Sequence, residues 1–425
     1  MKELNIAIAG LGIVGGGVYE ILTKQNDLLN KRSTNKINLV AVSSRSKKDF
    51  VDESKIKFYT NSLDLASDKN IDVIVETIGG ADGIAYELCK KTLQNKKHYV
   101  TANKAMIASH GLELAKLAKE NGVTLAFEAS VAGAIPVIKT LKEGLAGNQI
   151  SKIYGILNGT CNYILTKMEE DKVSFEDALK QAQKLGYAEA DPTFDIEGID
   201  TAHKIAILAA VAKNSAVNLE NMHIEGITKI SLHDIKFAKE FGFKIKLLGS
   251  FEDLGGANIK QTVYPCLVRK KSVIGSTNDS FNCIATLADN ANWNWQVGRG
   301  AGSKTTASAV VADIVDIANN RFSMPFGADV SELTQVKLAD IKTRVGAYYI
   351  RFVAEKEFAK SSGFIKEIFA EEVLDQSIIE DFADDKVIYG IKTSKLKEEQ
   401  ANAYIAKLSS HKEISQINLI RIEEV

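Results

Sequence analysis

The chain has 425 residues, of which 45% are hydrophobic and 25% charged, close to the average of soluble globular proteins. This composition excludes a disordered, collagen-like or disulfide-stapled small protein, and the length predicts two to four domains. Lys and Arg total 53 against 54 Asp and Glu, so the formal net charge is −1. Since nucleic-acid binders more often carry a basic surplus, we expect no nucleic-acid partner.

The cysteines and the first residues predict a reducing compartment. Cys89, Cys161, Cys266 and Cys283 form no C-x-x-C pair of the kind that holds structural zinc. The opening MKELNIAIAGLG is broken by Asn5 and ends in glycines, unlike a signal peptide. The longest alanine-rich apolar stretch, 205–212, is too short to span a bilayer. We therefore expect a cytoplasmic protein with no membrane partner.

The first part of the chain alternates short apolar strands with helices. Strands are expected at 4–9, 37–44, 71–80, 98–104 and 123–130, and helices at 14–29, 82–95 and 110–121. Strands that alternate with helices of this length indicate βαβ units around a parallel sheet. The pattern predicts a doubly wound α/β nucleotide-binding domain over residues 1–130.

The middle of the chain, residues 131–325, changes character. Helices are expected at 136–147, 174–185, 200–213 and 304–320, and strands at 151–157, 245–252, 259–268 and 272–276. Because few helical crossovers separate the last three strands, an α+β domain with an antiparallel or mixed sheet is favoured. The helix at 304–320 is expected to pack back on the nucleotide-binding domain.

The last part of the chain predicts a small separate module. Residues 326–344 contain no strong pattern and are expected to form a linker. Over 345–425 we expect strands at 346–355, 376–382, 386–392 and 414–422, and helices at 361–374 and 396–408. The order βαββαβ is typical of a ferredoxin-like fold.

A glycine-rich turn directly follows the first strand and opens a helix. It reads Gly10-Leu11-Gly12-Ile13-Val14-Gly15. Gly10 permits a tight turn, Gly12 lets the backbone approach a pyrophosphate, and Gly15 allows close packing of helix and strand. The helix N-terminus favours the negative charge of the ligand. In this strand–turn–helix context, dinucleotide binding is favoured over a glycine-rich turn without a ligand.

The end of the second strand bears on the choice of cofactor. Sites that prefer NAD usually place Asp or Glu there to bind the ribose 2′-hydroxyl. Here residues 42–48 read VSSRSKK, without a carboxylate. The planar guanidinium of Arg45 could bind a 2′-phosphate, which favours NADP over NAD. The alternative is an ordinary solvated basic loop.

Carboxylates gather before the apolar helix at 200–213. They are Glu189, Asp191, Asp195, Glu197 and Asp200. Such a cluster beside an apolar segment predicts a site for a cationic group, such as an α-ammonium. Asp200 and Lys204 are spaced i, i+4 and share one helix face. Lys204 could therefore be partly desolvated and act as a general acid or base, and the alternative is a surface ion pair.

Three further segments suit turns that face a ligand, and each has an ordinary alternative. Lys104, in Thr101-Ala102-Asn103-Lys104 at a strand end, could contact cofactor or substrate, or be solvated. Asn158-Gly159-Thr160 could approach a ligand or cap the following helix. Gly298 to Gly302 could face the cofactor or form a flexible loop. His203 is expected to pack or face solvent, and the histidines form no pattern typical of a metal site.

These motifs, in this order, resemble the homoserine dehydrogenase family. The resemblance rests on residues 10–15, 101–104, 128–135, 158–160 and 186–204, and on 300–302 followed by 304–307. It covers about residues 1–325, and the tail from about 345 resembles the ACT regulatory domain. The implied fold is a Rossmann domain, an α+β catalytic and dimerisation domain, and an ACT domain. The implied reaction is the reversible NAD(P)H-dependent reduction of L-aspartate 4-semialdehyde to L-homoserine, toward threonine, methionine and isoleucine.

The resemblance also implies roles for individual residues. Lys204 matches a catalytic lysine that donates a proton to the aldehyde oxygen, and Lys104 matches a second lysine near substrate and nicotinamide. Glu189, Asp200 and Asp195 match carboxylates that bind the substrate. The resemblance adds Gly186 and Gly302 as backbone contacts near the cofactor. Together with the glycine turn and the loop of Arg45, the expected cofactor-binding residues are Gly10, Gly12, Ile13, Val14, Gly15, Arg45, Thr77, Lys104, Gly186 and Gly302. A monovalent cation, Na⁺ or K⁺, is implied at Glu128, Val131, Gly133 and Ile135.

The tail departs from the ACT pattern. ACT domains commonly carry Pro-Gly after their first strand, whereas residues 360–364 read KSSGF. An altered effector site is therefore expected, threonine feedback is an open question, and the tail could instead serve dimer contacts. The resemblance implies a homodimer through the central sheet, or a homotetramer built with the tail. The alternatives are a nucleotide-binding ligand or redox sensor, or a dehydrogenase of another small amino-bearing substrate.

Overall fold

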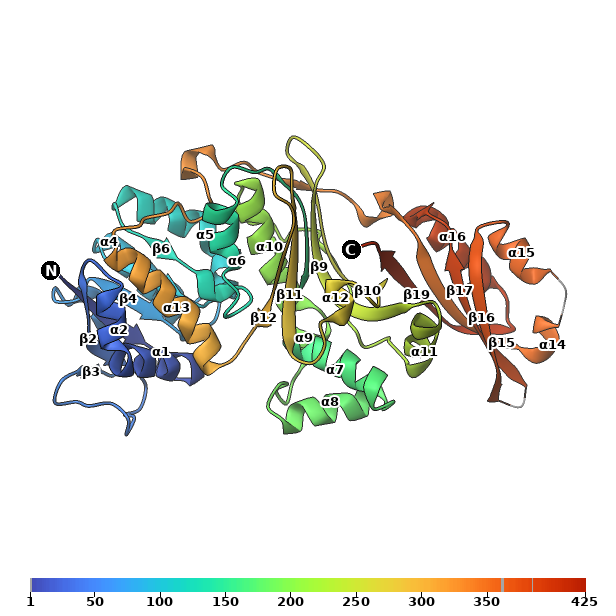
Figure 1. Cartoon of the computed structure of the whole chain (residues 1–425), viewed down its shortest axis with the longest axis horizontal. Coiled ribbons are helices and arrows are strands. Elements are labelled where there is room, and N and C mark those ends of the chain that lie inside the picture. The colour runs from blue at the N-terminus through green and yellow to red at the C-terminus, as the bar shows by residue number, and fades with distance from the viewer. Residues whose placement is uncertain (1, 361–362, 384) are drawn as a thin grey trace.

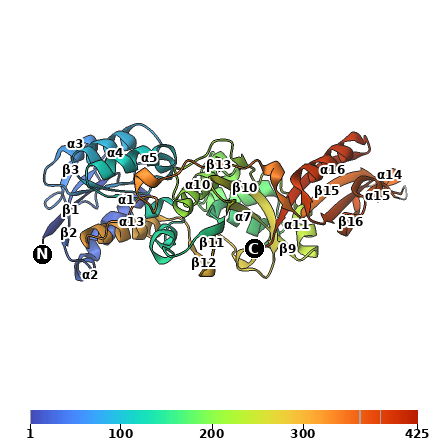
Figure 2. The ribbon, with the colours of Figure 1, turned by 90° about the horizontal axis from the view of Figure 1, so that it is seen from above.

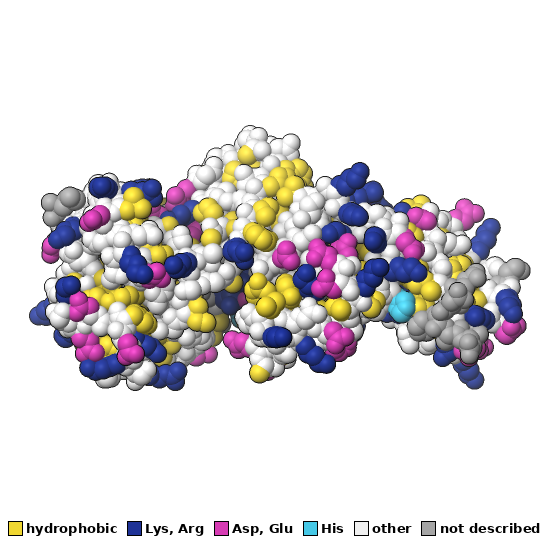
Figure 3. All heavy atoms as spheres, turned by 60° about the horizontal axis from the view of Figure 1, so that its bottom comes forward, with side chains coloured by type: hydrophobic (Ala, Val, Ile, Leu, Met, Phe, Trp, Pro, Cys, Tyr) yellow, Lys and Arg dark blue, Asp and Glu magenta, His cyan; other side chains and the backbone are white. Residues whose placement is uncertain are grey.

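The computed structural model describes residues 2–360, 363–383 and 385–425. Three regions follow one another along the long axis of the chain (Figures 1 and 2). The N-terminal sheet lies at one end, a larger sheet with helices on it forms the middle, and the tail forms the other end. On the face that Figure 3 shows, charged side chains of both signs are interspersed over all three regions.

The N-terminal region is a parallel sheet of the Rossmann type, with strand order β3-β2-β1-β4-β5-β6. Its strands are β1 (Glu3–Ala9), β2 (Lys36–Ser43), β3 (Lys57–Tyr59), β4 (Val73–Glu76), β5 (His98–Thr101) and β6 (Leu125–Ala126). Its helices are α1 (Ile13–Lys24), α2 (Asn26–Lys31), α3 (Leu63–Ser67), α4 (Ile84–Gln94) and α5 (Lys104–Glu120). The strand order reverses between β1 and β4, which is where such sheets bind their ligands.

Several expected elements of this region differ in extent. The strands expected at 71–80 and 98–104 end at Glu76 and Thr101, and the helix expected at 14–29 is divided into α1 and α2. The strand expected at 123–130 is wrong beyond Ala126, because the chain leaves the sheet and makes a 3-10 turn, η1 (Glu128–Ser130). There the backbone N–H of Glu128 donates to Oδ2 of Asp313 at 3.0 Å, a bond that a further sheet residue would not make. The helix expected at 110–121 begins six residues earlier, at Lys104.

Helix α13 (Ser303–Ala318) follows the central strands in sequence but packs on the N-terminal region (Figure 1). It packs against α1, and Gly17 makes the close approach possible. A Cβ on Gly17 would lie 2.8 Å from the carbonyl oxygen of Ser303. Val18 of α1 and Val310 and Ile314 of α13 are buried in one apolar cluster with the sheet.

The central region is built on the antiparallel strands β12-β11-β7-β9-β10. They are β7 (Ile150–Ile156), β9 (Phe243–Asp253), β10 (Asn258–Arg269), β11 (Phe281–Ala288) and β12 (Asn292–Arg299). The helical segments are α6 (Val137–Lys139), the π-helical η2 (Thr140–Gly144), α7 (Gly159–Glu170), α8 (Phe175–Lys184), α9 (Thr193–Ile196), α10 (Ile199–Lys213) and α11 (Leu232–Glu240). Among the described residues, no helix combines the length and apolar character needed to cross a membrane.

The strand expected at 272–276 is wrong. The segment forms the short helix α12 (Val273–Ser276), because the Ser272 hydroxyl caps it by accepting from the backbone N–H of Gly275 at 3.1 Å. The hairpin of β11 and β12 was not expected from the sequence. The helix expected at 136–147 ends at Gly144 and carries a π turn.

The tail has the expected order of strands and helices. It contains β15 (Tyr348–Glu355), α14 (Lys356–Ala359), α15 (Phe364–Phe369), β16 (Val373–Ala383), β17 (Lys386–Thr393), α16 (Glu398–Ser410) and β19 (Ile414–Glu423). The strand order is β19-β15-β17-β16, with antiparallel neighbours. The helix expected at 361–374 is shorter because β16 begins at Val373, and Ser361 and Ser362 lie outside the described residues.

The tail and the central region share one eleven-stranded sheet. Strand β19 pairs in parallel with β10, and Cys266 lies opposite Arg421. The expected linker lies along the same sheet, since β13 (Lys337–Leu338) also pairs with β10. Short elements complete the path: β8 (His223–Ile224), η3 (Val330–Glu332), η4 (Ile341–Thr343), β14 (Val345–Gly346) and β18 (Leu396–Lys397).

Candidate active site

The first turn of α10 buries a lysine against a carboxylate. The Lys204 ammonium donates to Oδ2 of Asp200 at 2.7 Å and to the carbonyl oxygen of Leu157 at 2.8 Å. Asp200 is 4% exposed and Lys204 9%, which excludes the solvated surface pair. An ammonium has three donors. Among the described residues the third N–H of Lys204 has no acceptor, so it can donate to a ligand.

A second lysine reaches the same carboxylate from the N-terminal domain. Lys104 begins α5, and its Nζ lies 3.1 Å from Oδ1 of Asp200. Asn103 fixes this helix start, because its side chain accepts from the backbone N–H of Met106 and donates to the carbonyl oxygen of Gly80. Lys104 thereby joins the end of β5 to α10, across the boundary between the two regions.

Asp200 is ionised because two ammonium groups face it. Burial by itself raises the pKa of this carboxyl, but the charges of Lys204 and Lys104 outweigh burial and hold the pKa at about 2. The amide of Asn158 adds a hydrogen bond of 2.8 Å to Oδ2. The site therefore holds one carboxylate that is ionised at neutral pH, between two lysine side chains.

Asn158 holds two carboxylates of the predicted cluster together. Its Nδ2 donates to Oδ1 of Asp195 at 2.7 Å as well as to Asp200. Its Oδ1 accepts from the backbone N–H of Cys161, so it also caps α7, as one of the two sequence interpretations held. Burial raises the pKa of Asp195. Among the described residues Oδ2 of Asp195 has no hydrogen-bond partner and can accept from a ligand.

The ring of Phe194 also lies beside these charged residues, and no sequence pattern predicted its position. The Lys104 ammonium lies 5.6 Å from the centre of the Phe194 ring, which is 41% exposed. The His203 ring packs edge-on against the same ring at 5.5 Å, so the expectation that His203 packs is confirmed. Neither α9 nor the contact across the domain boundary could be read from residue spacing.

Glu189 and Gly186 lie in the exposed segment between α8 and α9. The Glu189 side chain is exposed and makes no hydrogen bond or ion pair with the described residues, so the structure does not bring it to Asp200. Gly186 follows α8 with φ +76°, a conformation that favours glycine. The carbonyl oxygen of Tyr187 accepts from the Thr160 hydroxyl at 2.7 Å, which fastens this segment to the start of α7.

The glycine turn after β1 has the expected geometry. Gly10 has φ +97°, and a Cβ on Gly15 would lie 1.9 Å from the carbonyl oxygen of Gly10. The Thr77 hydroxyl donates to the same oxygen at 2.8 Å, so Thr77 supports the turn. A Cβ on Gly12 would meet nothing within 4 Å, so the backbone there faces open space.

A second helix start lies beside this turn. Gly302 precedes α13 with φ +128°, and the Ser303 hydroxyl donates to the carbonyl oxygen of Ile13 at 2.6 Å. The N-termini of α1 and α13 are thereby adjacent, and both favour an anionic ligand. The Ile13 side chain is 77% exposed, whereas Val14 is half-buried.

Arg45 lies in the exposed loop after β2. Among the described residues no carboxylate pairs with it, whereas Lys47 is bound to Glu53 at 2.7 Å. The loop packs against α1, because the Tyr19 and Phe50 rings lie 5.3 Å apart. Arg45 thus lies exposed just beyond the carboxyl end of β2.

The four residues of the implied cation site share one turn. The buried Glu128 carboxylate accepts from the backbone N–H groups of Ile138 at 3.0 Å and Lys139 at 2.7 Å. Burial and the charge of Asp313 raise the Glu128 pKa to about 7. The carbonyl oxygen of Ile135 accepts from Val137. Each of these oxygens retains a lone pair, so the donors fit a hard monovalent cation.

Gly133 and Val131 complete this turn. A Cβ on Gly133 would lie 2.6 Å from the carbonyl oxygen of Gly300, so the turn lies directly on the loop before α13. Val131 is fully buried. Among the described residues no group of three His, Cys, Asp or Glu side chains could hold a metal ion. Any ion here would therefore rest on one carboxylate and backbone carbonyls.

Glu76 is a buried residue that the sequence interpretation did not include. Its carboxylate accepts from the Thr101 hydroxyl at 2.6 Å and from the backbone N–H groups of Ile78 and Gly79. It thereby fixes the loop after β4 against the end of β5. A charged residue at the end of an otherwise apolar strand was the available signal.

Known proteins resemble this chain over its whole length. A family model described as "Homoserine dehydrogenase" matches residues 136–315, and one described as "Homoserine dehydrogenase, NAD binding domain" matches residues 10–128. A homoserine dehydrogenase of Pseudomonas aeruginosa is 36% identical over 436 residues, covering 100% of both chains. One of Neisseria gonorrhoeae is 43% identical over 325 residues, 75% of this chain and 73% of the relative.

Solved structures agree with these relatives. A homoserine dehydrogenase from Thiobacillus denitrificans superimposes with a TM-score of 0.90 at 35% identity, covering 100% of this chain and 99% of that one. A hyperthermophilic archaeal homoserine dehydrogenase in complex with NADPH has a TM-score of 0.64 at 26% identity, covering 76% and 99%.

Proposed function

The chain belongs to the homoserine dehydrogenase family and catalyses that family's reaction, and we propose that Lys204 is its proton donor. In the direction of reduction, a hydride adds to the aldehyde carbon of L-aspartate 4-semialdehyde and a proton to its oxygen, giving L-homoserine. The observation that carries the proposal is the free third N–H of Lys204 beside two satisfied ones. Turnover of homoserine by Lys204 variants tests it.

The remaining charged groups divide between orientation and substrate binding. Asp200 accepts from Lys204, Lys104 and Asn158, so its part is to hold the two lysines beside the substrate. Asp195 has a free oxygen, and with Glu189 it accepts the substrate ammonium. Lys104, whose ammonium lies over the Phe194 ring, would contact substrate and nicotinamide.

The cofactor is held by the turn after β1 and by the adjacent start of α13. The nicotinamide nucleotide supplies or accepts the hydride when bound. Gly10, Gly12 and the first turn of α1 would hold its pyrophosphate, with Gly15 and Thr77 supporting that turn. Ile13, Val14, Gly186 and Gly302 contact the nucleotide beyond it. Arg45 takes the 2′-phosphate, so NADP is preferred over NAD.

Glu128, with the carbonyl oxygens of Val131, Gly133 and Ile135, holds Na⁺ or K⁺. A cation there would stabilise the turn that supports the loop before α13. The melting temperature in NaCl, KCl and tetramethylammonium chloride at equal ionic strength tests this site. A higher melting temperature with one of the metal ions supports it, and equal values contradict it.

Regulation and assembly complete the proposal. The tail is an ACT-like regulatory module whose effector site departs from the usual Pro-Gly pattern, with threonine as the effector to be tested. The chain assembles as a homodimer through the central sheet, or as a homotetramer with the tail, which its mass in solution tests. A cytoplasmic location is supported by four free buried cysteines. Assays of turnover with NADP and with NAD test the reaction and the cofactor preference. The same assays with added threonine test the effector.

A further inference from the structure

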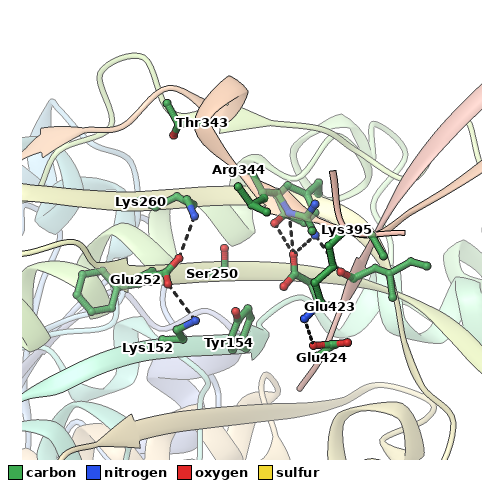
Figure 4. A pocket seen from close by; sticks show the side chains of 16 residues that line it. Lys152, Tyr154, Ser250, Glu252, Lys260, Thr343, Arg344, Lys395, Glu423 and Glu424 are labelled. Atoms are coloured by element: carbon green, nitrogen blue, oxygen red, sulfur yellow. Dashed lines mark hydrogen bonds and ion pairs between the residues drawn. The ribbon is translucent and has the colours of Figure 1, made fainter. Parts of the chain in front are cut away.

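A polar cavity lies between the central sheet and the tail, away from the proposed active site. Its volume is about 390 Å³, and its walls come from β7, β9 and β10, from the segment 343–347 and from the end of β19. Figure 4 shows the side chains that line it, and charged groups of both signs point into it from the sheet and from the tail.

The charges in the walls are unequal. Lys152, Lys260, Arg344 and Lys395 face Glu252, Glu423 and Glu424, so four cations stand against three carboxylates. Glu252 is held between Lys152 and Lys260, each at 2.9 Å. On the tail side Arg344 donates to one oxygen of Glu423, at 2.9 Å from Nη2. One positive charge of the cavity is therefore not neutralised by the described residues.

Three polar groups of the cavity have unused hydrogen-bonding capacity. Arg344 is 4% exposed, and among the described residues its buried Nη1 has no hydrogen-bond partner. The Tyr154 hydroxyl has none there either. Within the same part of the chain, Glu423 accepts from Arg344 and Tyr264 through Oε1, and its Oε2 accepts from neither (Figure 4). A buried charged donor without an acceptor is costly, so Nη1 of Arg344 is available to an anionic group that enters the cavity.

We infer that this cavity binds a small amino dicarboxylate. Such a molecule has one net negative charge, which matches the excess positive charge of the walls. One carboxylate reaches Arg344 and the Tyr154 hydroxyl, the other lies near Lys152 and Lys260, and the ammonium pairs with Oε2 of Glu423. A phosphate would place its second charge against Glu423 and is disfavoured.

The cavity is connected to the active site by a short series of contacts. Arg421, next to the cavity on β19, stacks on Tyr264 at 4.6 Å and pairs with Glu225 at 2.9 Å. Ile227 follows Glu225 by two residues, and its backbone N–H donates to the carbonyl oxygen of Ile196, the residue after Asp195. An occupant that moves Tyr264 or β19 therefore acts on the segment that carries the active-site carboxylates.

Isothermal titration calorimetry on the full chain tests the site with L-aspartate, L-threonine and succinate. L-aspartate is expected to bind more tightly than both others. Tyr154→Phe, which removes a hydroxyl without a protein partner and spares the fold, should weaken it about tenfold. Lys395→Ala should weaken it as well, whereas Lys360→Ala, an exposed tail lysine paired with Glu357, should not.

The same titration separates this cavity from the active site, because L-aspartate also resembles the substrate. Glu189→Gln should leave the calorimetric affinity unchanged. In turnover assays the bound ligand should change kcat in the unaltered chain and not in Tyr154→Phe. The inference is overturned by an absence of binding at millimolar L-aspartate, by equal binding of L-threonine, or by an effect on KM alone that Tyr154→Phe retains. Turnover of homoserine without added L-aspartate is measured separately, and its absence would contradict the proposed function but not the cavity.

Discussion

Lys204 and Asp200 are buried together one turn apart on α10, with 2.7 Å between Nζ and Oδ2. The i, i+4 spacing puts both side chains on one helix face, and the apolar remainder of the helix excludes water from them. Lys104 approaches the other carboxylate oxygen from α5, so Asp200 also links the N-terminal region to the central region. We therefore expect substitution of Lys204 to change mainly the turnover rate, and substitution of Asp200 to change the stability of the fold as well.

Replacing Lys204 by alanine removes the proposed proton donor. We expect kcat to fall by at least about 10²-fold, the lower end of the range for general acid–base catalysis. The dissociation constant of NADPH, measured by nucleotide fluorescence, should stay near that of the unaltered chain. Lys213→Ala is the matched control, since Lys213 ends the same helix and pairs with Asp253 instead. Turnover of Lys204→Ala close to the original rate would show that another group supplies the proton.

Asp200→Asn tests the electrostatic arrangement through pH. The folded pKa of about 2 lies below the unfolded value of 3.8, so ionised Asp200 stabilises the fold above about pH 4. This contribution is lost as the pH falls toward 2. The melting temperature of Asp200→Asn should thus lie below the original at pH 7, and the gap should narrow between pH 4 and pH 2. Asp49→Asn, in an exposed loop, should show no gap; a constant gap for Asp200→Asn would refute the argument.

Arg45→Ala tests the choice of cofactor. If the guanidinium binds the 2′-phosphate, its removal should raise KM for NADP about tenfold and leave KM for NAD unchanged, as expected for one charge-assisted contact. Lys47→Ala in the same loop should change neither value, because Lys47 is bound to Glu53. Equal KM values for both cofactors in the unaltered chain would already contradict the role of Arg45.

Arg351→Met tests how firmly the tail is fixed to the central region. Asp234 on α11 is fully buried and accepts from Arg351 at 2.8 Å and from the Tyr349 hydroxyl at 3.1 Å. Removing one partner of a buried ion pair costs about 3–5 kcal/mol. Urea unfolding should show this loss in the free energy of unfolding. Arg269→Met, at an exposed position, should cost less than about 1 kcal/mol, and similar losses for both would contradict the assignment.

The local parts of the fold were predictable from sequence. The glycine turn after β1 follows from the backbone conformations that only glycine adopts easily, and the Asp200–Lys204 pair follows from helical spacing. Both signals are local in the sequence. The contact of Lys104 with Asp200 joins residues 96 positions apart. No periodicity encodes such a contact. The end of a strand pointed to Lys104 and helical spacing pointed to Asp200, and only the resemblance assigned the two residues to one site. Likewise the pairing of β10 with β19 depends on tertiary packing, so the sequence predicted a separate tail where the sheet is continuous.

Lys246, a lysine buried on β9 of the central sheet, provides the last test. It is 2% exposed and donates to Oδ1 of Asn162 and to the carbonyl oxygen of Thr277. Burial lowers its pKa from 10.5 to about 7. Between these two values the unfolded chain binds a proton that the folded chain lacks, so the free energy of unfolding rises with pH in this interval.

Lys246→Met removes this titration. The stability of the unaltered chain relative to the variant should therefore increase from pH 7 to about pH 10, measured by urea unfolding at each pH. Lys244→Met is the matched control on the same strand, since Lys244 pairs with Glu169 at 3.1 Å. A stability difference that does not vary with pH would mean that Lys246 remains protonated in the fold. In that case its hydrogen bonds to Asn162, Thr277 and Asn278, and not its burial, determine its charge.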